Sequence, residues 1–326
     1  MTAGLPPLTA NQLADLAQLC KGSGDPLRLA VLRALKTDSF GVLELCDIFA
    51  MKQQAMSHHL KVLAKSGAVT TRREGNSIFY RRSLADRSLP QGQLLAALYD
   101  ALDQVALERD TVERIEAIKQ DREELAREFF DRHAEQFRQQ QELIALFDQY
   151  ADSVRDLLLQ TQPGRHQTAL EIGPGEGAFL PVLAQLFREV TAIDISREML
   201  EKAEQLRRQQ RLDNVRLLQA DTEDAVREGM QVDRIVCNMV LHHVPSPADV
   251  FTDCARLLNP GGALIVADLC RHDQDWAKQS CGDLWLGFDP EDLSDWATEA
   301  GLSEGQSQFL GLRNGFQIQF RLFHNE

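Results

Sequence analysis

The sequence of 326 residues lacks any long uninterrupted apolar run. No stretch approaches the roughly 18 to 20 apolar residues that a membrane-spanning helix needs, and no basic segment precedes an apolar one near the first residue, as in a secretory signal. The cysteines show no Cys-x-x-Cys spacing, which disfavours a disulfide framework or a structural zinc site. They are Cys20, Cys46, Cys237, Cys254, Cys270 and Cys281. We therefore expect a soluble, cytoplasmic protein with no membrane contact and no metal centre.

Basic residues are also fewer than acidic residues in the chain as a whole, but they outnumber the acidic residues in the N-terminal part. The chain has 35 Lys and Arg residues against 49 Asp and Glu residues, for a formal net charge of -14. Residues 1–90 nevertheless hold 12 basic and 7 acidic residues, whereas the remainder holds 23 basic and 42 acidic residues. This distribution disfavours a generally basic nucleic-acid-binding protein and favours one DNA-facing module on an acidic body. Chance clustering of surface charge is the alternative.

Short helical patterns dominate the first 83 residues. Two of them, 42–50 and 53–66, are separated by a tight turn, which is the pattern of a helix-turn-helix. Two strand-like runs follow, 69–73 and 77–82, with a turn at 74–76 between them. A helix-turn-helix followed by a basic hairpin predicts a winged helix.

The segment from 94 to about 150 shows no strand signal and is rich in Glu, Gln, Arg and Ala. Five apolar residues lie near the a and d positions of a heptad repeat: Leu95, Leu98, Leu102, Val105 and Val112. Arg109 and Glu116 interrupt this seam. The pattern predicts a short dimerisation helix, with packing against the chain's own domain as the alternative.

From residue 168 onward, apolar strand-like runs alternate with helical segments. The strand-like runs are 168–172, 190–194, 215–219, 232–237 and 262–268. Such alternation predicts an α/β fold with a doubly wound, mainly parallel sheet. The last segment, 306–323, differs because two strand-like runs flank Arg313-Asn-Gly315, which indicates an antiparallel hairpin.

The most distinctive motif, Glu171-Ile-Gly-Pro-Gly-Glu-Gly177, lies at the end of the first of these strands, and residues 178–187 after it have a helical pattern. Glycine permits positive φ and lets a backbone approach a ligand closely, and a helix N-terminus then faces the same point. The motif therefore predicts a nucleotide-type pocket. Taken alone it also fits a dinucleotide fingerprint, with Asp194 at roughly the expected distance.

Polar residues stand at the predicted carboxyl ends of the strands, where open α/β sheets bind their ligands. They are Glu171, Asp194, Asp221 with Thr222 after it, and Asn238. A carboxylate at Asp194 can accept hydrogen bonds from both hydroxyls of a ribose, and Asp221 can meet an adenine edge. Asn238 stands beside the place where an amino-acid group would lie.

These positions resemble class I methyltransferases that use S-adenosylmethionine (SAM), over about residues 125–326. Besides the glycine loop, the resemblance rests on Leu217-Leu-Gln-Ala-Asp221, Asn238-Met-Val-Leu-His-His243 and Leu257-Leu-Asn-Pro-Gly-Gly262, in the order of the family. It implies that the pocket holds SAM or its demethylated product S-adenosylhomocysteine (SAH), and not a nicotinamide dinucleotide. The residues expected at this cofactor are Glu171, Gly173, Gly175, Gly177, Asp194, Ile195, Asp221, Thr222, Asn238 and Met239.

Residues 8 to about 110 resemble ArsR-type winged-helix repressors. The resemblance is carried by Leu45-Cys-Asp-Ile48, by Ser57-His-His-Leu-x-x-Leu63-x-x-x-Gly67 and by the wing ending Tyr80-Arg-Arg82. Such repressors bind partly palindromic operator DNA as homodimers. The residues expected at DNA are Gln53, Gln54, Ser57, His58, Lys61, Arg72, Arg73 and Arg81.

This sequence departs from the metal-sensing members of that family. Where they have Cys-x-Cys before the turn, this chain has Glu44-Leu-Cys46. One thiolate cannot form the multi-sulfur site that a metalloid needs, so we expect no metal sensing there. Likewise, Cys237, Cys270 and Cys281 form no recognisable arsenite-binding triad.

Catalysis stays an open question at this point. SAM carries an activated methyl group, so the protein need supply only orientation and, for some acceptors, a general base. His242 and His243 are the available candidates for that base, and a place in the pocket wall is the alternative for both.

The predicted organisation has three segments. They are a winged helix-turn-helix DNA-binding domain at 1–92, a helical segment for dimerisation, linkage and pocket covering at 93–165, and a Rossmann-like methyltransferase domain at 166–326. The first hypothesis is a transcriptional repressor whose methyltransferase domain binds SAM or SAH as an effector and which controls methionine or SAM metabolism. The alternative is an active small-molecule methyltransferase whose DNA-binding domain regulates its own gene.

Overall fold

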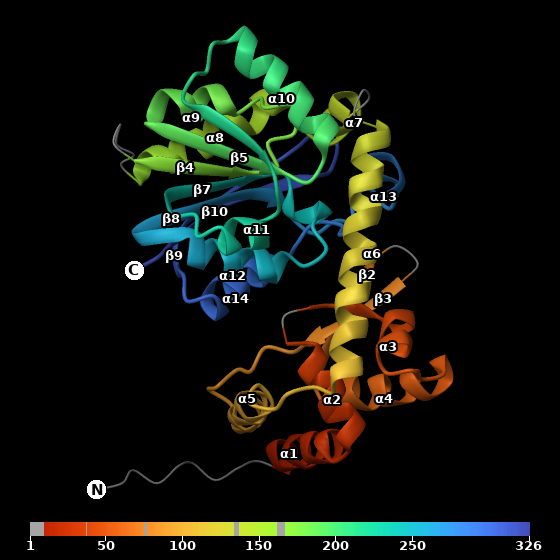
Figure 1. Ribbon diagram of the computed structural model, residues 1–326. Helices are drawn as coiled ribbons and strands as arrows, with labels where there is room; N and C mark the ends of the chain where they lie inside the picture. Colours follow the sequence, from red (N-terminus) through yellow and green to blue (C-terminus); the bar gives the residue numbers. More distant parts are fainter. Residues whose placement is uncertain (1–9, 37, 75–76, 134–136, 162–166) are drawn as a thin grey trace, which may run out of the picture. The chain divides into compact units, whose positions relative to one another are not determined.

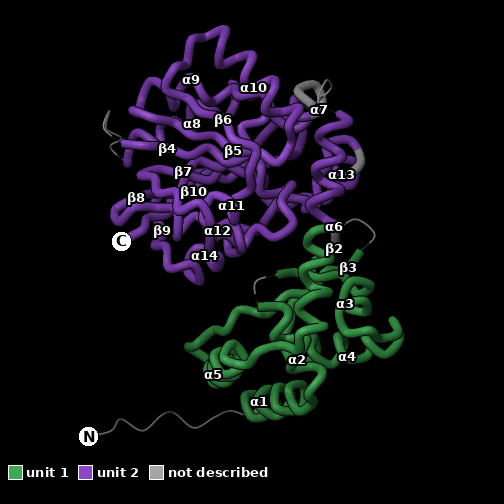
Figure 2. The backbone as a smooth tube through the Cα atoms, viewed as in Figure 1, with its two compact units in different colours: residues 1–120 green, residues 121–326 purple. Residues whose placement is uncertain are grey.

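The computed structural model describes residues 10–36, 38–74, 77–133, 137–161 and 167–326 (Figure 1). The chain forms two compact units, residues 1–120 and 121–326 (Figure 2). The division falls inside helix α6 (Arg109–His133), so the predicted middle segment 93–165 is shared between the units. Within the described ranges, no helix combines the length and the apolar character that crossing a membrane requires.

The first unit packs short helices against a three-stranded antiparallel sheet of order β1-β3-β2. Its elements before α6 are α1 (Ala10–Ser23), α2 (Pro26–Ala34), β1 (Phe40–Gly41), α3 (Val42–Ile48), α4 (Gln53–Lys65), β2 (Val69–Glu74), β3 (Ser77–Arg82) and α5 (Pro90–Leu102). The predicted helix-turn-helix is confirmed as α3 and α4, and the predicted hairpin as β2 and β3.

Local chemistry explains where the helices of the first unit begin and end. The Asp25 carboxylate accepts a hydrogen bond from the backbone N–H of Arg28 at 3.0 Å, with Pro26 in the first turn of α2. The Glu44 carboxylate accepts one from the Gly41 N–H at 2.7 Å, at the start of α3. After α3 the chain turns at Ala50, whose φ of 49° is left-handed. These caps replace hydrogen bonds that the helix ends lack.

The predicted heptad seam does not form one continuous helix. Helix α5 ends at Leu102, and Val105 lies in the turn before α6. Leu95 and Leu102 are buried in the core of the first unit, whereas Val105 and Val112 are exposed. The apolar face of α5 thus packs against its own domain, which was the alternative, and a role of this segment in dimerisation stays a prediction.

The second unit is a seven-stranded sheet of order β6-β5-β4-β7-β8-β10-β9, in which the first five strands are parallel and β10 is antiparallel to both neighbours. Its strands are β4 (Thr168–Ile172), β5 (Glu189–Asp194), β6 (Val215–Gln219), β7 (Val232–Asn238), β8 (Leu258–Leu269), β9 (Ser303–Gly311) and β10 (Gln317–His324). This is the predicted doubly wound sheet with its terminal hairpin. The fifth strand begins four residues earlier than predicted, where Leu258 pairs with Val232 of β7.

Helices cover both faces of this sheet (Figure 1). They are α7 (Phe137–Ile144), α8 (Phe147–Gln160), α9 (Leu180–Leu186), α10 (Arg197–Gln209), α11 (Thr222–Arg227), the 3-10 turn η1 (Leu241–His243), α12 (Pro247–Leu257), α13 (Trp276–Cys281) and α14 (Pro290–Glu299). Since both faces are covered, the central strands are nearly continuous apolar runs, and this is the reason for their clear signal in the sequence.

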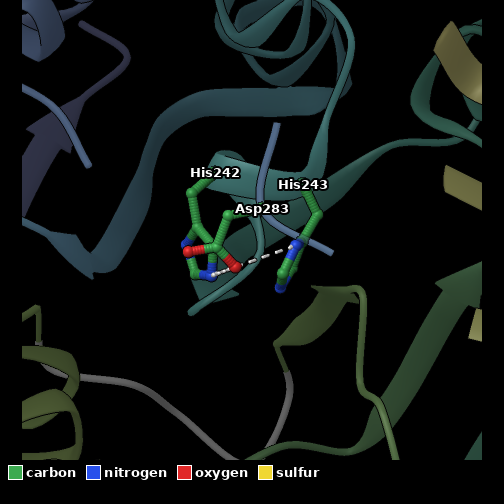
Figure 3. Close-up of side chains that lie close together, drawn as sticks. All are labelled: His242, His243 and Asp283. Carbon is green, nitrogen blue, oxygen red and sulfur yellow. Dashed lines mark ion pairs between the residues drawn. The ribbon is translucent and has the colours of Figure 1, made fainter. Parts of the chain in front are cut away.

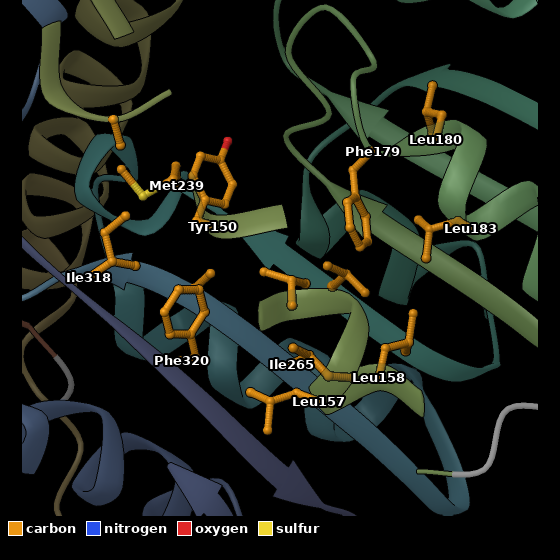
Figure 4. Packing of buried hydrophobic residues seen from close by; sticks show 14 of the residues in the cluster. Tyr150, Leu157, Leu158, Phe179, Leu180, Leu183, Met239, Ile265, Ile318 and Phe320 are labelled. Carbon is orange, nitrogen blue, oxygen red and sulfur yellow. The ribbon is translucent and has the colours of Figure 1, made fainter. Parts of the chain in front are cut away.

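The main core of the second unit lies between the sheet and the helices α8 and α9 (Figure 4). Leu157 and Leu158 of α8 meet Ile265 of β8 and Phe320 of β10 within this cluster, and all four are at most 1% exposed. Residues packed this closely contribute about 2 to 5 kcal/mol each, judged by truncation to alanine. This rigid core holds the carboxyl ends of the parallel strands in place.

Candidate functional site

The glycine loop joins β4 to α9 at the carboxyl edge of the parallel strands. Gly173, Gly175 and Gly177 have φ values of 64°, 55° and 85°, in the left-handed region that favours glycine. A Cβ on Gly173 would lie 2.4 Å from Cγ2 of Val240, so the loop passes very close to the chain after β7. Helix α9 begins at Leu180, two residues later than predicted, and the Leu180 N–H donates to the Gly177 carbonyl at 3.1 Å.

Beside this loop, Glu171 is buried and Asn238 is half-buried, and both have buried polar atoms without partners among the described residues. Within the described part of the chain, Oε2 of Glu171 and both amide atoms of Asn238 have no hydrogen-bond partner. Burial raises the pKa of Glu171 to about 8, the Asn238 amide lowers it only in part, and the charge on Asp194 raises it further. Buried polar atoms without partners cost about 1 to 3 kcal/mol each, so they indicate a place where a polar ligand completes the hydrogen bonds.

Asp194, at the end of β5, turns its carboxylate toward the same loop. Its Oδ1 accepts a hydrogen bond from the backbone N–H of Ser196 at 2.9 Å. Burial nevertheless raises the pKa of Asp194 to about 6, against the lowering effect of the Ser196 and Gly175 backbone N–H groups. The Ser196 hydroxyl also donates to Asp131 of α6 at 2.7 Å, so the second half of α6 borders this pocket.

The other predicted cofactor residues divide into two groups. Ile195 and Asp221 lie at the same edge, where the Asp221 carboxylate accepts a hydrogen bond from the Asp224 N–H at 2.7 Å and so begins α11. Thr222 instead donates its hydroxyl to Asp253 of α12 at 2.7 Å. Met239 packs into the core with a φ of 51°. The side chains of Thr222 and Met239 thus serve the fold at this edge.

Both predicted base candidates lie in η1, directly after β7. Nδ1 of His242 is 2.7 Å from Oδ1 of Asp268, a fully buried carboxylate on β8. Asp283 approaches both imidazoles from the loop after α13 (Figure 3). Its Oδ1 lies 3.9 Å from Nε2 of His242 and 3.7 Å from Nδ1 of His243.

These surroundings shift the pKa values of the two histidines in opposite directions, although the sequence alone does not distinguish them. Burial by itself would lower the pKa of His242, but the carboxylates of Asp268 and Asp283 outweigh it and raise the pKa to about 9. Burial and the charge on His242 lower the pKa of His243. At neutral pH, His242 is therefore an imidazolium with no free base character, and His243 is neutral.

Helix α6 covers this histidine cluster within the second unit. The Phe130 ring meets the His243 ring edge to face, with centroids 4.9 Å apart. The Arg122 guanidinium donates to the Pro245 carbonyl at 3.3 Å and stacks over Trp285, 5.4 Å from the ring centre. Phe129 and Phe130 belong to the segment 93–165, part of which was predicted to cover a pocket, and residues 134–136 of that segment lie outside the described residues.

The residues predicted to meet DNA lie on one exposed face of α4 and on the β2-β3 hairpin. The α4 residues Gln53, Gln54, Ser57, His58 and Lys61 are all exposed, and the opposite face of the helix buries Met56, Leu60 and Leu63. On the hairpin, Arg73 is exposed, while Arg72 and Arg81 are half-buried.

One basic residue of the wing has a structural role instead. Arg82 donates to Asp103 at 2.8 Å and to the Leu32 carbonyl at 2.7 Å, so it anchors β3 to the helices of its unit.

Sequence reasoning missed three carboxylates of the second unit: Asp131, Asp268 and Asp283. Asp268 follows an apolar strand run, so the rule that selected Asp194 could have found it. Asp131 lies in a highly charged helix and Asp283 in a loop, and no local pattern distinguishes either of them from surface residues.

Comparisons with known proteins agree with this division of the chain. Residues 170–266 match a family model described as a methyltransferase domain, and residues 24–72 match one described as a helix-turn-helix domain. The ubiquinone biosynthesis O-methyltransferase of Coxiella burnetii (strain Dugway 5J108-111) is 28% identical over 155 residues, which are 44% of this chain and 65% of that protein. The enzyme of the same name from Xanthomonas axonopodis pv. citri (strain 306) is 27% identical over 146 residues, which are 41% of this chain and 61% of that protein. The chain thus spans less than two thirds of the length of these relatives.

A solved structure shows the same fold. It is the magnesium protoporphyrin IX methyltransferase of Synechocystis PCC 6803 with bound SAH, which is 19% identical, has a TM-score of 0.52, and covers 63% of this chain and 100% of its own. At this identity the likeness extends to the fold alone. The protein therefore joins an N-terminal helix-turn-helix domain to a C-terminal domain with the Rossmann-like fold of SAM-dependent methyltransferases.

Proposed function

We propose that this protein is a DNA-binding transcriptional regulator of the ArsR type whose methyltransferase domain binds SAM or SAH as an effector. The observation that carries the proposal is the presence, in one chain, of an exposed polar face on α4 and of a glycine loop beside buried polar atoms that lack hydrogen-bond partners within the described residues. Two sites in one molecule can be coupled by linkage, and a coupling of about 1 to 3 kcal/mol changes operator affinity about 5- to 150-fold. With such an effector, the regulator would control genes of methionine or SAM metabolism.

The residues of the second unit fit SAM or SAH. The left-handed glycines let the backbone approach the ligand, and Asp194 offers a carboxylate to the ribose hydroxyls. The orphaned amide of Asn238 and the carboxyl of Glu171 provide both a donor and acceptors for the amino-acid end of the ligand. SAM itself supplies an activated methyl group when bound, whereas the chain binds and orients it.

In the first unit, α4 has the exposed polar face that a recognition helix presents to base edges in the major groove. Gln53, Gln54, Ser57 and His58 supply donors and acceptors there. Lys61 and the hairpin arginines supply positive charge for phosphates, contacts that position the protein without reading sequence. A homodimer would place two such helices on the halves of a partly palindromic operator.

Helix α6 is the element through which we expect the two sites to communicate. In the first unit, Arg114 donates to the carbonyl of Ile48 at the end of α3, at 3.1 Å, and Lys119 pairs with Asp38 at 3.0 Å. In the second unit, Asp131 accepts the Ser196 hydroxyl beside Asp194. One helix thus bonds to the helix-turn-helix and to the edge of the pocket, so a ligand that shifts its second half biases its first half.

A second candidate function is a small-molecule methyltransferase that regulates its own gene. The names of the relatives favour it, because both are O-methyltransferases. The η1 histidines beside the glycine loop give it a base candidate, with Trp285 nearby on the acceptor side. In this case the N-terminal domain would regulate the gene according to the amount of enzyme present, and not in response to the ligand.

One assay separates the two functions. A labelled DNA fragment from the gene's own upstream region is mixed with the full-length protein, and SAM or SAH is titrated while DNA release and methyl turnover are both recorded. The regulator proposal expects operator affinity to change at least about 5-fold with one ligand. Operator affinity that is indifferent to both ligands contradicts it, whereas turnover on a metabolite supports the enzyme.

A further inference from the structure

The histidine cluster of the second unit contains a feature that neither candidate function uses. His242, His243 and Asp283 each offer one donor atom, all three atoms lie within 4.8 Å of one another, and all three side chains are buried. The two histidines come from η1 and the carboxylate comes from a separate loop (Figure 3). We propose that this cluster binds a divalent first-row transition metal ion, with Zn²⁺ as its representative.

The donor set selects the class of ion. Two imidazole nitrogens and one carboxylate oxygen form the set that holds Zn²⁺ and Fe²⁺ in proteins, whereas Mg²⁺ and Ca²⁺ prefer oxygen alone. In a tetrahedral site with bonds of about 2.0 to 2.2 Å, donor atoms stand about 3.3 to 3.5 Å apart. The two distances from Asp283 to the histidines, 3.9 and 3.7 Å, therefore need to contract by a few tenths of an ångström. Nδ1 of His243 would also have to exchange its 3.2 Å contact with the Gly282 carbonyl for the ion.

A second observation independent of these three atoms points to the same ligand. Asp268 Oδ1 lies 2.7 Å from Nδ1 of His242, and Asp268 also accepts the N–H groups of Leu241 and Leu269 at 2.8 and 2.7 Å. It holds the ring with Nε2 facing Asp283. A carboxylate that orients the far nitrogen of a histidine in this way is the usual outer partner of a metal-binding histidine.

The charge of the site also favours a cation. Asp268 and Asp283 are both at most 3% exposed, and buried carboxylates are stable only when paired or bound to a metal. A divalent ion at the three donor atoms would place two positive charges beside these carboxylates.

The loop that carries Asp283 is held against η1 before any ion binds. The backbone N–H groups of Leu284 and Trp285 both donate to the carbonyl of His242, at 2.9 and 3.1 Å. The loop begins at Gly282, where a Cβ would lie 2.4 Å from the Phe129 ring. Such preorganisation lowers the cost of bringing the three donors together. Three protein ligands would leave a fourth position for water or another ligand.

The test uses the full-length protein after treatment with a chelator, without SAM and without DNA. Zn²⁺ is titrated by calorimetry, and Co²⁺ is used as a spectroscopic probe because its visible bands report the number and type of its ligands. We expect one ion per chain and a Co²⁺ spectrum typical of nitrogen and oxygen ligands, without the charge-transfer band of a thiolate. Asp283→Asn and His243→Gln should each weaken binding at least about 100-fold, and Asp268→Asn should weaken it about 10- to 100-fold.

The matched control is His272→Gln, because His272 lies in the same unit, packs on Phe316 with ring centroids 4.7 Å apart, and is not one of the three proposed ligands. It should bind Zn²⁺ as the unmodified protein does. Circular dichroism checks that each variant is folded, and Zn²⁺ should raise the melting temperature of the unmodified protein but not that of Asp283→Asn or His243→Gln. Equal affinity in these variants and the control, or ions bound only weakly at several surface sites, would overturn the proposal. Because no SAM or DNA is present, this outcome is independent of the regulator proposal.

Discussion

The two units of this protein carry their candidate binding residues in opposite ways. On α4 of the first unit these residues are exposed, and the helix buries only its apolar face. In the second unit Glu171 is buried at 2% exposure, and Asn238 has buried amide atoms without partners. The candidate residues on α4 are thus open to solvent, whereas the candidate polar atoms of the second unit are enclosed by the protein.

This difference predicts what each unit responds to. The groups of the second unit with raised pKa values include Glu171 at about 8, Asp194 at about 6 and His242 at about 9. The second unit should therefore respond to pH. The first unit presents Lys and Arg side chains at its surface, so its binding should respond to salt.

The largest expected effect concerns the glycine loop. Gly175→Val should weaken SAM binding about 100-fold or more, because a branched side chain enters the space expected for the ligand. Calorimetry with SAM measures it. Gly229→Val is the matched control, since Gly229 is also left-handed, at a φ of 72°, and a Cβ there meets nothing within 4 Å. If Gly175→Val binds SAM as well as the control does, the assignment of the loop is wrong.

The next effect concerns Glu171 and pH. Its pKa rises from 4.5 to about 8 on folding, so the stability that it contributes is complete below about pH 4.5 and is lost as pH rises through about 8. Glu171→Gln should remove this loss, which is on the order of a few kcal/mol. Chemical denaturation between pH 5 and 9 measures it. The exposed Glu189→Gln should follow the unmodified protein, and parallel curves for all three would contradict the burial of an ionisable Glu171.

A smaller effect concerns the hairpin of the first unit. Replacing Arg72 and Arg73 with Ala should reduce the salt dependence of DNA binding by up to about two units of slope, because each phosphate contact releases close to one counterion. DNA affinity measured across a series of salt concentrations gives this slope. Arg87→Ala removes an equally exposed charge outside the hairpin and should leave the slope unchanged. An unchanged slope in the double variant would mean that the hairpin does not contact DNA.

The smallest effect concerns the interrupted seam. Val112 is 42% exposed, so Val112→Ser should change the free energy of unfolding by no more than about 0.5 kcal/mol and should leave the oligomeric state unchanged. Leu95→Ala is the comparison within the same segment. Because Leu95 is buried, its truncation should lower the free energy of unfolding by about 2 to 5 kcal/mol. Sedimentation and denaturation measure the two properties. If Val112→Ser instead dissociates a dimer, the apolar seam is part of the dimer interface.

Much of the fold followed from local patterns. The strands β4 to β7 were predicted to within one residue, because a sheet covered on both faces needs continuous apolar runs, whereas β8 and β9 begin earlier than predicted. The glycine loop and the residues after each strand followed from the same logic, since parallel strands bring their carboxyl ends to one edge. The helix-turn-helix was equally clear, because its helices and turn are close in sequence.

Contacts between distant segments settled the rest. The fate of Leu95 and Val112 depended on where α5 ends and what it packs against, which a heptad pattern does not contain. His242 and His243 are adjacent and identical in type, yet one is charged and the other neutral. The difference arises from Asp268 on β8 and Asp283 in a later loop. A residue's pKa and its fitness as a metal ligand are set by charges and donors a few ångströms away, and the fold brings these together from distant parts of the chain.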